Sequence, residues 1–316
     1  MKRILAVLMA LVMVLSLSAC GGKAMTMGTG GSQGTYYGYG GVLGNQILKS
    51  AGITVNVVST DGSKANILGV DAGNYQLGTV QSDVMAYAWE GSRSFEQEGA
   101  LKSFRVIGGL YAEAVQLVTM DPAIKSVADL KGKKVSIGAP GSGVYFNAID
   151  ILAAAGLSES DIIAQKQSFG DSADALKDGK IDAAFIVAGA PTPAVQELCT
   201  ASKAYLVPID GAIAQTLMNT SPYYTTYNIP AGTYDGQETD ITTVTVKATL
   251  IVSASASEED VYNITKSIFD NIDTIAAAHA KGAELSIENA VNGMTAPFHA
   301  GAAKYFAEKN VTVKTE

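Results

Sequence analysis

Short apolar runs alternate with helical patterns through the first third of the chain. Apolar and β-branched residues predict strands over residues 24–27, 53–58, 75–80 and 104–110, and helical periodicity predicts helices over 37–50, 66–70 and 84–89. Gly, Ser, Thr or Asp residues lie between each of the first three strands and its following helix, where they favour a turn and a helix start. Such strand–loop–helix units are typical of an α/β fold.

The middle of the chain repeats this pattern. A strand over residues 135–137 precedes a small-residue loop over 138–143 and a helix over 144–155. A short helix over 174–178, a glycine and a buried strand over 181–187 then match the earlier sequence of helix, glycine and strand. The repeat predicts two lobes of the same α/β design, and because open α/β sheets bind ligands beyond the carboxyl ends of their strands, a ligand cleft is expected between them.

Two longer apolar segments have the length to join the lobes. Residues 104–118 continue as one extended stretch, and residues 241–252 are rich in Val, Thr and Ile. We expect them to be two extended hinge connections. Residues 221–238 contain Pro222, Pro230, Gly232 and Gly236 and are expected to be irregular.

The C-terminal tail is helical by its pattern over residues 258–281 and 287–309. We expect these helices to pack back onto the first lobe. The predicted division is therefore a first lobe of residues 20–112 and 247–316 and a second lobe of residues 113–246.

The amino terminus has the pattern of a secretory signal over residues 1–19. Lys2 and Arg3 precede an apolar stretch, and Leu17-Ser18-Ala19-Cys20 resembles a bacterial lipobox, which implies that Cys20 carries a lipid in the mature protein. The alternative is an ordinary signal peptide with an incidental cysteine. The protein is expected outside the cytoplasmic membrane, anchored by this lipid.

Charge narrows the range of partners. Removing residues 1–19 would take Lys2 and Arg3 from the 22 Lys and Arg residues and none of the 30 Asp and Glu residues, which leaves a net charge of −10. A protein without a basic surface has little affinity for nucleic acid, so we expect no nucleic-acid partner. Cys199 would then lack a disulfide partner and is expected to be a small buried residue.

The first glycine-rich loop allows an enzymatic alternative. Gly30-Gly31-Ser32-Gln33-Gly34 matches the G-x-S-x-G pattern of a hydrolase, with Ser32 as nucleophile and His279 or His299 downstream. No His-Gly-Gly oxyanion motif accompanies it in the sequence, and the loop matches neither the dinucleotide fingerprint nor the P-loop. The two histidines lack the neighbours of a metal site. We therefore expect a protein that is not an enzyme and that needs neither metal nor cofactor.

The same loop, placed between a strand and a helix, can bind an anion through backbone N–H groups and the positive end of the helix dipole. Arg93 and Arg105 are the arginines of the mature sequence, and both lie outside the strand-end loops. An anionic ligand would therefore be held by neutral donors. Glu113 could accept an ammonium group of the ligand, or it could be a solvated surface acid.

A set of motifs along the chain resembles one receptor family. The motifs are Gly28-Thr29-Gly30-Gly31 through Tyr36-Tyr37, Gln81-Ser82-Asp83, Leu110-Tyr111-Ala112-Glu113, residues 135–143, Ala190-Pro191-Thr192 and Ile229-Pro230-Ala231-Gly232-Thr233-Tyr234. Together they resemble the TAXI-type solute receptors of TRAP transporters, although Ala112 stands where that family often has Pro. The resemblance implies a two-lobed periplasmic-binding-protein-like fold of type II with the ligand cleft between the lobes. It also implies capture of a small carboxylate such as glutamate and its delivery to an ion-gradient-driven membrane permease.

The strand-end loops and these motifs together define the candidate ligand-binding residues. They are Gly30, Gly31, Ser32, Thr35, Tyr36, Asn66, Gln81, Ser82, Asp83, Glu113, Pro140, Ser142, Gly143, Asn147, Pro191, Thr192 and Tyr234. A ligand-sensing subunit of a signalling receptor would have the same fold and differ only in its partner, so it remains an alternative to a transport receptor.

Overall fold

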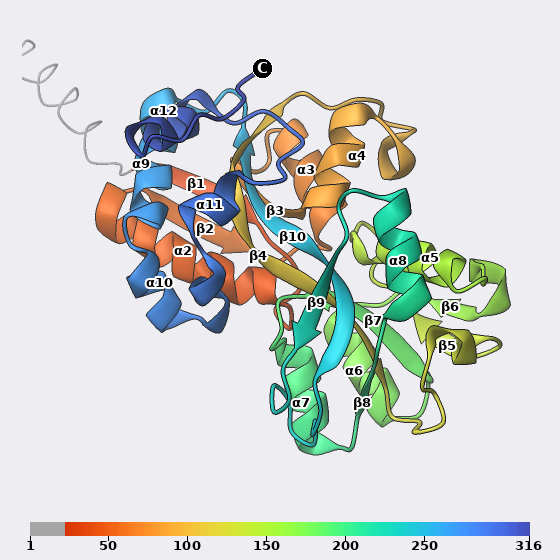
Figure 1. Ribbon diagram of the computed structural model, residues 1–316. Coiled ribbons are helices and arrows are strands. Elements are labelled where there is room, and N and C mark those ends of the chain that lie inside the picture. Colours follow the sequence, from red (N-terminus) through yellow and green to blue (C-terminus); the bar gives the residue numbers. More distant parts are fainter. Residues whose placement is uncertain (1–22) are drawn as a thin grey trace, which may run out of the picture.

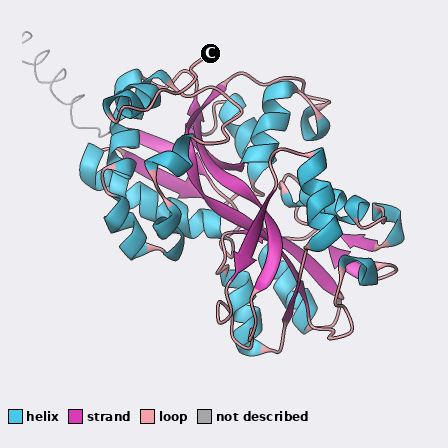
Figure 2. Ribbon diagram, in the orientation of Figure 1, coloured by secondary structure: helices cyan, strands magenta, loops and turns pink. Residues whose placement is uncertain are grey.

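The computed structural model describes residues 23–316. Its chain forms two lobes that lie side by side, with strands running from one into the other (Figure 1). Helices cover the strands of both lobes (Figure 2). The expected signal peptide and Cys20, which is expected to carry a lipid, lie outside the described residues. Within residues 23–316, no helix is long and apolar enough to cross a membrane.

The described strands form one ten-stranded sheet, and lobe 1 is built on the part with the order β2–β1–β3–β10–β4. Its strands are β1 (Ala24–Gly28), β2 (Thr54–Val58), β3 (Leu77–Gln81), β4 (Phe104–Thr119) and β10 (Ile241–Ser253). Its helices are α2 (Thr35–Ala51), α3 (Ser63–Asp71), α4 (Ser82–Glu90), α9 (Glu258–Phe269), α10 (Ile272–Ala278), α11 (Ile287–Val291) and α12 (Ala300–Glu308). β1, β2 and β3 are parallel, whereas β10 is antiparallel to β3 and β4.

Lobe 2 repeats the arrangement of the first three strands. β5 (Lys134–Ser136) lies between β6 (Ile163–Gln165) and β7 (Ala183–Ala188), as β1 lies between β2 and β3. β8 (Tyr205–Val207) pairs with β4, and β9 (Thr225–Ile229) pairs with β10. The helices are α5 (Val144–Ala154), α6 (Phe169–Lys177), α7 (Pro193–Ala201) and α8 (Gly211–Thr220). The sequence repeat therefore corresponds to a structural repeat.

β4 and β10 run through both lobes as one antiparallel pair (Figure 1). β10 pairs with β9 as far as Thr245 and with β3 from Ala248 onward. β4 pairs with β10 from Phe104 and begins its pairing with β7 at Ala114. The predicted two extended connections between lobes are thus two long paired strands.

The buried apolar residues form separate clusters in the two lobes. One cluster contains residues from Met25 to Tyr111 and from Ala248 to Phe306. Two further clusters, on the two sides of the lobe 2 strands, contain residues between Ala114 and Val246. Each lobe therefore has its own hydrophobic core.

Helix α2 packs closely on the strands of lobe 1 because its glycines face them. A Cβ added to Gly40 would lie 2.9 Å from Cγ2 of Thr29, and one added to Gly44 would lie 3.4 Å from Cβ of Val55. Glycine weakens an isolated helix by about 1 kcal/mol relative to alanine. Here it allows a close approach of α2 to the loop that follows β1.

Some expected elements are corrected by the structure. The irregular segment contains strand β9, and the tail is not helical between Val291 and Ala300, where Phe298 forms a bridge with Val106. β6 and α8 were not predicted. The hydroxyl-rich loops before α3 and α4 do not supply side-chain caps for these helices. The N-cap residues are Gly62 for α3 and Gln81 for α4, and neither position has a side-chain cap bond.

Candidate ligand-binding site

A cavity of about 560 Å³ lies between the lobes, at the carboxyl ends of strands from both lobes. Loops after β1, β2, β5 and β6 surround it, and Glu113 of β4 also lines it. The lining residues are Gly30, Gly31, Ser32, Gln33, Gly34, Thr35, Tyr36, Ser59, Thr60, Asp61, Gly62, Ser63, Gln81, Glu113, Ala139, Ser142, Gly143, Val144, Ser168, Phe169, Gly170, Asp171, Asp174, Val187 and Ala188.

Four helices begin at this cavity, two from each lobe. Thr35, Ser63, Val144 and Phe169 are the first residues of α2, α3, α5 and α6, and all four line the cavity. The first turn of a helix has N–H groups without an intrahelical partner and carries a positive partial charge. The starts of α2 and α5, which have no side-chain cap bond, can therefore bind polar groups of a small solute without basic side chains.

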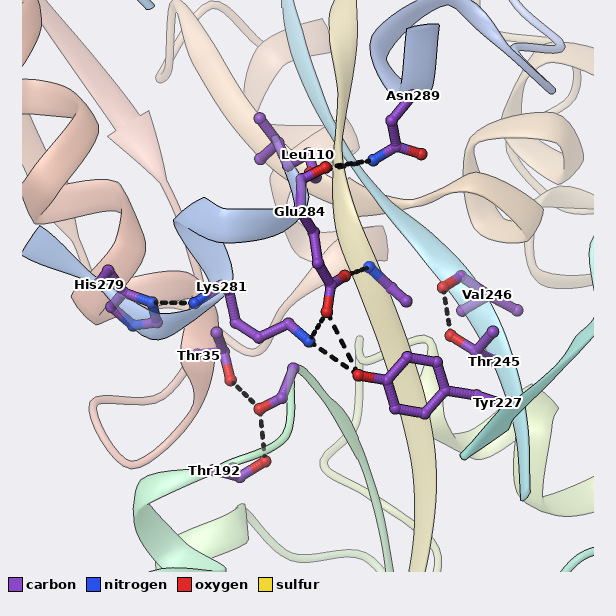
Figure 3. A network of polar contacts seen from close by, with 12 residues as sticks. Thr35, Leu110, Thr192, Tyr227, Thr245, Val246, His279, Lys281, Glu284 and Asn289 are labelled. Carbon is purple, nitrogen blue, oxygen red and sulfur yellow. Dashed lines mark hydrogen bonds and ion pairs between the residues drawn. The ribbon is translucent and has the colours of Figure 1, made fainter. Parts of the chain in front are cut away.

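The lobes touch each other directly around the cavity. Gly141 O accepts hydrogen bonds from the N–H groups of Lys64 (3.0 Å) and Ala65 (3.2 Å) at the start of α3. On the other side, Thr35 Oγ1 donates to Gly189 O at 2.8 Å (Figure 3), and the Ala194 N–H donates to Gln33 O at 3.1 Å. These contacts hold the glycine loops of the two lobes across the cleft from each other.

Glu113 lies where β4 passes from one lobe into the other. It pairs with Val246 of β10, and the next residue begins the pairing with β7. Its side chain is only 2% exposed, and Tyr36 Oη donates to its Oε2 at 2.7 Å. Burial raises the pKa of Glu113 well above its ordinary value, against the lowering effect of the Tyr36 hydrogen bond. The hypothesis of a solvated surface acid is therefore wrong.

Asp83, Asn147 and Gln81 form a buried polar network between the lobes. Asn147 Nδ2 of α5 donates to Asp83 Oδ2 at 2.9 Å and to Tyr224 Oη at 2.8 Å. Gln81 Nε2 donates to Asn147 Oδ1 at 2.8 Å. Gln81 lines the cavity, whereas Asp83 and Asn147 lie outside its lining. The latter two residues thus join the lobes beside the cavity.

Asn66 and Ser82 also lie outside the lining and support the backbone. Asn66 Nδ2 donates to Thr29 O at 2.6 Å and to Thr79 O at 2.7 Å, and its Oδ1 accepts a hydrogen bond from Thr60. Ser82 Oγ accepts a hydrogen bond from the Lys247 N–H at 3.1 Å. Asn66 therefore fixes the loops that form the wall of the cavity.

Pro191, Thr192, Tyr234 and Pro140 are not brought to the cavity. The Thr192 N–H donates to Tyr234 Oη at 2.9 Å, and Gln116 Nε2 donates to Thr192 Oγ1 at 2.8 Å, so this group is satisfied within lobe 2. Pro191 precedes helix α7, which begins at Pro193. Pro140 lines a separate groove that adjoins the cavity.

Sequence reasoning missed the part of the cavity that follows β6. Ser168, Phe169 and Asp171 line it, and Ser168 Oγ caps helix α6 by accepting from the Asp171 N–H at 3.2 Å. The three-residue strand β6 is too short to give a strong apolar pattern. The Ser-x-x-Asp spacing at the start of α6 was the signal that could have indicated this loop.

The histidines do not support the hydrolase alternative. Ser32 lies in the exposed part of the first loop, whereas His279 Nδ1 accepts from the Lys281 N–H at 3.1 Å (Figure 3). His299 contacts the Ala256 carbonyl and the Gly301 N–H. Both rings thus have backbone partners of their own, and within residues 23–316 no hydrogen bond links either ring to Ser32.

The strand order β2–β1–β3–β10–β4, its repeat in the second lobe and the cavity between them define a two-lobed periplasmic-binding-protein-like fold, which confirms the predicted fold class. The chain belongs to the NMT1-like family, whose family model matches residues 27–309.

Solved structures with the same fold have low sequence identity to this chain. The alkanesulfonate-binding protein SsuA from Xanthomonas axonopodis pv. citri, bound to MOPS, is 16% identical with a TM-score of 0.51, and the match covers 92% of each chain. A protein from Bordetella bronchiseptica RB50 is 19% identical with a TM-score of 0.56, covering 90% of this chain and 88% of that one. A putative L-cystine ABC transporter protein from Listeria monocytogenes is 19% identical with a TM-score of 0.53, covering 84% and 98%.

Proposed function

We propose that this protein is an extracytoplasmic receptor that captures a small solute between its lobes and delivers it to a membrane permease. The observation that carries the proposal is the cavity itself, which both lobes line with strand ends, glycine loops and helix starts. A site shared in this way binds most tightly when the lobes are together, so ligand binding and lobe closure are coupled.

The finer assignment rests on the sequence motifs. We propose a TAXI-type receptor of a TRAP transporter, anchored by a lipid on Cys20, with a glutamate-like amino acid or another small carboxylate as ligand. The candidate contacts are the predicted residues that line the cavity: Gly30, Gly31, Ser32, Thr35, Tyr36, Gln81, Glu113, Ser142 and Gly143. The absence of Lys and Arg among the described lining residues supports binding by neutral donors.

We also propose that the lobes divide at residues 112/113 and 246/247, so that lobe 1 comprises residues 20–112 and 247–316. The separate hydrophobic clusters support this division, because the first ends at Tyr111 and resumes at Ala248. The points of division then lie on β4 and β10, the two strands that would bend on closure.

A thermal-shift screen with amino acids and dicarboxylates tests the receptor proposal. A ligand present at about 100 times its Kd stabilises the folded state by about 2.7 kcal/mol. The Ser142→Leu variant places a bulky side chain in the cavity and should abolish the shift without lowering the melting temperature of the protein alone by more than a few degrees. Ser160→Leu is the control, because Ser160 is exposed and lies outside the lining. A ligand shift that survives in Ser142→Leu would contradict the proposed site.

A further inference from the structure

Asp83 lies where the two lobes meet and is fully buried there. It is a first-turn residue of α4 in lobe 1, and its side chain is 0% exposed. Asn147 of α5 in lobe 2 donates to its Oδ2 at 2.9 Å. Lobe 2 also contacts the residues on either side of Asp83, because a Cβ on Gly143 would meet both Gln81 and Val84. Separation of the lobes would therefore remove a hydrogen bond from this carboxyl group and admit water to it.

The hydrogen bonds around Asp83 lack a donor. Both hydrogens of Asn147 Nδ2 are used, one for Asp83 Oδ2 and one for Tyr224 Oη, and Asn147 Oδ1 accepts from Gln81 Nε2. Asp83 Oδ1 and Gln81 Oε1 are both buried without a partner in the described structure. Both atoms are acceptors while Asp83 is ionised, and a buried acceptor without a donor is unfavourable. A proton on Asp83 would convert one of the two acceptors into a donor.

The titratable groups that face Asp83 do not favour its ionised form. Asp150 of α5 and Glu113 of β4 are acids whose negative charge would oppose that of Asp83. The tyrosines around it stay neutral because burial raises the pKa of each, and they are Tyr87, Tyr223 and Tyr224. None of these groups supplies a positive charge.

The basic groups on the elements that pack against α4 are engaged elsewhere. Arg93 donates to both carboxylate oxygens of Asp150. Lys247 of β10 directs its Nζ to two carbonyl groups at the end of α11. Lys64 of α3 forms an ion pair with Glu98 at 2.9 Å. The buried carboxyl group of Asp83 is therefore left without a cation to balance its charge.

We propose that closure of the lobes creates a proton-binding site at Asp83, so that the closed receptor holds a proton that the open receptor releases. This property belongs to closure itself and is independent of which solute is bound and of which membrane protein receives it.

The direction of the effect follows from the two environments of the carboxyl group. In the closed protein, burial raises the pKa of Asp83 to about 6, against the opposing hydrogen bonds from the Val84 N–H and from Asn147. In contact with water, an aspartate titrates at about pH 4. Closure therefore takes up a proton between about pH 4 and about pH 6, and above that range it must bury an ionised carboxylate. Acid thus favours the closed state, whereas a rise in pH favours opening and release.

A disulfide between the lobes allows a test that needs no solute. A Cβ on Gly170 of α6 would lie 3.8 Å from Cβ of Gln33 in lobe 1, which is a usual Cβ separation for a disulfide. The variant Gln33→Cys/Gly170→Cys should lock the lobes together when oxidised, and Cys199→Ala removes the other thiol of the described chain. Gly143→Leu should hold the lobes apart, because even its Cβ would lie 1.4 Å from Oε1 of Gln81.

The titration of Asp83 should differ between these two proteins. NMR of the side-chain carboxyl carbon, assigned by its absence in Asp83→Asn, should give a midpoint at about pH 6 in the locked protein and about pH 4 in Gly143→Leu. Small-angle scattering verifies that the lobes are together in the first protein and apart in the second. Midpoints that agree within about half a pH unit in these closed and open proteins overturn the proposal.

L-glutamate serves as a probe of the same link through binding. Its Kd should rise about tenfold from about pH 5 to about pH 8, as linkage requires for an acid whose midpoint moves from about pH 4 to about pH 6 on closure. Asp83→Asn keeps an acceptor for Asn147 and imitates the protonated acid, so its Kd should vary less than about twofold. Asp210→Asn is the control, because it removes an exposed acid of lobe 2 outside the lining, and it should retain the full change.

The results distinguish this inference from the proposed function. A Kd for L-glutamate that changes equally with pH in wild type and in Asp83→Asn overturns the proton link and leaves the receptor function standing. If L-glutamate does not bind to the folded mature protein, the proposed glutamate-like ligand fails, and the titration of Asp83 in the locked and open proteins decides the proton link.

Discussion

Gly143 shows how closely the lobes approach at the level of single atoms. A Cβ added to this residue would lie 1.4 Å from Oε1 of Gln81 and 2.8 Å from Cγ2 of Val84, both of which belong to lobe 1. Its φ of −78° is available to any residue, so the need for glycine comes from space and not from backbone conformation.

We therefore expect Gly143→Ala to oppose closure. The added methyl group must displace Gln81, which is held by Asn147, and ligand affinity should fall about tenfold or more, as isothermal titration would measure. Gly41→Ala is the control, because a Cβ there has no neighbour within 4 Å. Equal ligand affinities of wild type and Gly143→Ala would show that the lobes of the ligand-bound protein lie further apart at Gly143 than they do in this structure.

Asp83 predicts a dependence of stability on pH. Burial raises its pKa to about 6, against the opposing hydrogen bond from Asn147. The folded state then binds the proton more tightly than the unfolded state. Ionisation of Asp83 therefore costs no stability below about pH 4, costs progressively more as the pH rises to 6, and costs about 3 kcal/mol above pH 6. Asp83→Asn cannot titrate and should gain stability over wild type across this window in urea unfolding. A difference that stays constant from pH 4 to pH 7 would contradict this account.

At the scale of single residues, the sequence predicted which residues lie near strand ends and helix starts better than it predicted their burial and hydrogen-bond partners. Thr35, Tyr36, Ser142 and Gly143 were placed at the cavity because local patterns locate strand ends and helix starts. The burial of Glu113 was not predictable, because it depends on β10, more than 130 positions away, pairing with β4. Thr192 and Tyr234 look like site residues in sequence, but they satisfy each other in the fold.

At the scale of elements, the tail adds a support to the connection between lobes. The short helix η5 (Ala280–Glu284) brings Glu284 to β4, where its Oε2 accepts from the Ala112 N–H at 2.7 Å. Lys281 and Tyr227 of β9 meet the same carboxylate (Figure 3). A proline at position 112 would lack this N–H and could not make this contact.

We expect this support to contribute to stability. Glu284→Ala removes the partner of the buried Lys281 amine and should destabilise the protein by about 2–4 kcal/mol in urea unfolding. Glu288→Ala, an exposed position on α11, should have little effect. The double variant Lys281→Met with Glu284→Gln should recover part of the loss because no unpaired buried charge remains. Destabilisation as large in the double variant as in Glu284→Ala would argue against a charge effect.

The elements missed from sequence share a physical cause. β6 has three residues and β9 has an exposed, polar pattern, so neither buries enough apolar surface to leave a clear period. Longer elements such as α2 and β10 bury one or both faces and were predicted near their observed bounds. The local sequence pattern therefore predicts elements whose side chains form the hydrophobic core. The formation of short or exposed strands depends instead on pairing with strands distant in sequence.

At the scale of the whole molecule, Arg93 joins the lobes outside the cavity. The guanidinium of Arg93, a lobe 1 residue, donates to both carboxylate oxygens of Asp150 on α5 of lobe 2, at 2.6 and 3.2 Å. It also lies over the rings of Tyr87 (5.0 Å) and Phe146 (5.6 Å). This bidentate, stacked arrangement stabilises the lobes in contact without touching the lining.

We expect Arg93→Ala to weaken ligand binding through closure alone. Loss of this contact should raise Kd about 5- to 30-fold, equivalent to about 1–2 kcal/mol, and the effect should shrink at high salt. Arg105→Ala is the control, because Arg105 donates to carbonyls of Lys102 and Phe104 within lobe 1. Small-angle scattering should show a larger fraction of open molecules for Arg93→Ala. Unchanged affinity and scattering would mean that this contact does not limit closure.

The position of β10 between β3 and β4 also decides when the first lobe can fold. β3 and β4 are made early, but the strand that joins them begins at Ile241. Until that strand has been made, the first lobe has two unpaired strand edges and a divided sheet, and folding must wait for contacts of long sequence separation. The order of synthesis and the order of folding therefore differ: the lobe that is begun first is completed only after the strands of the second lobe have been made.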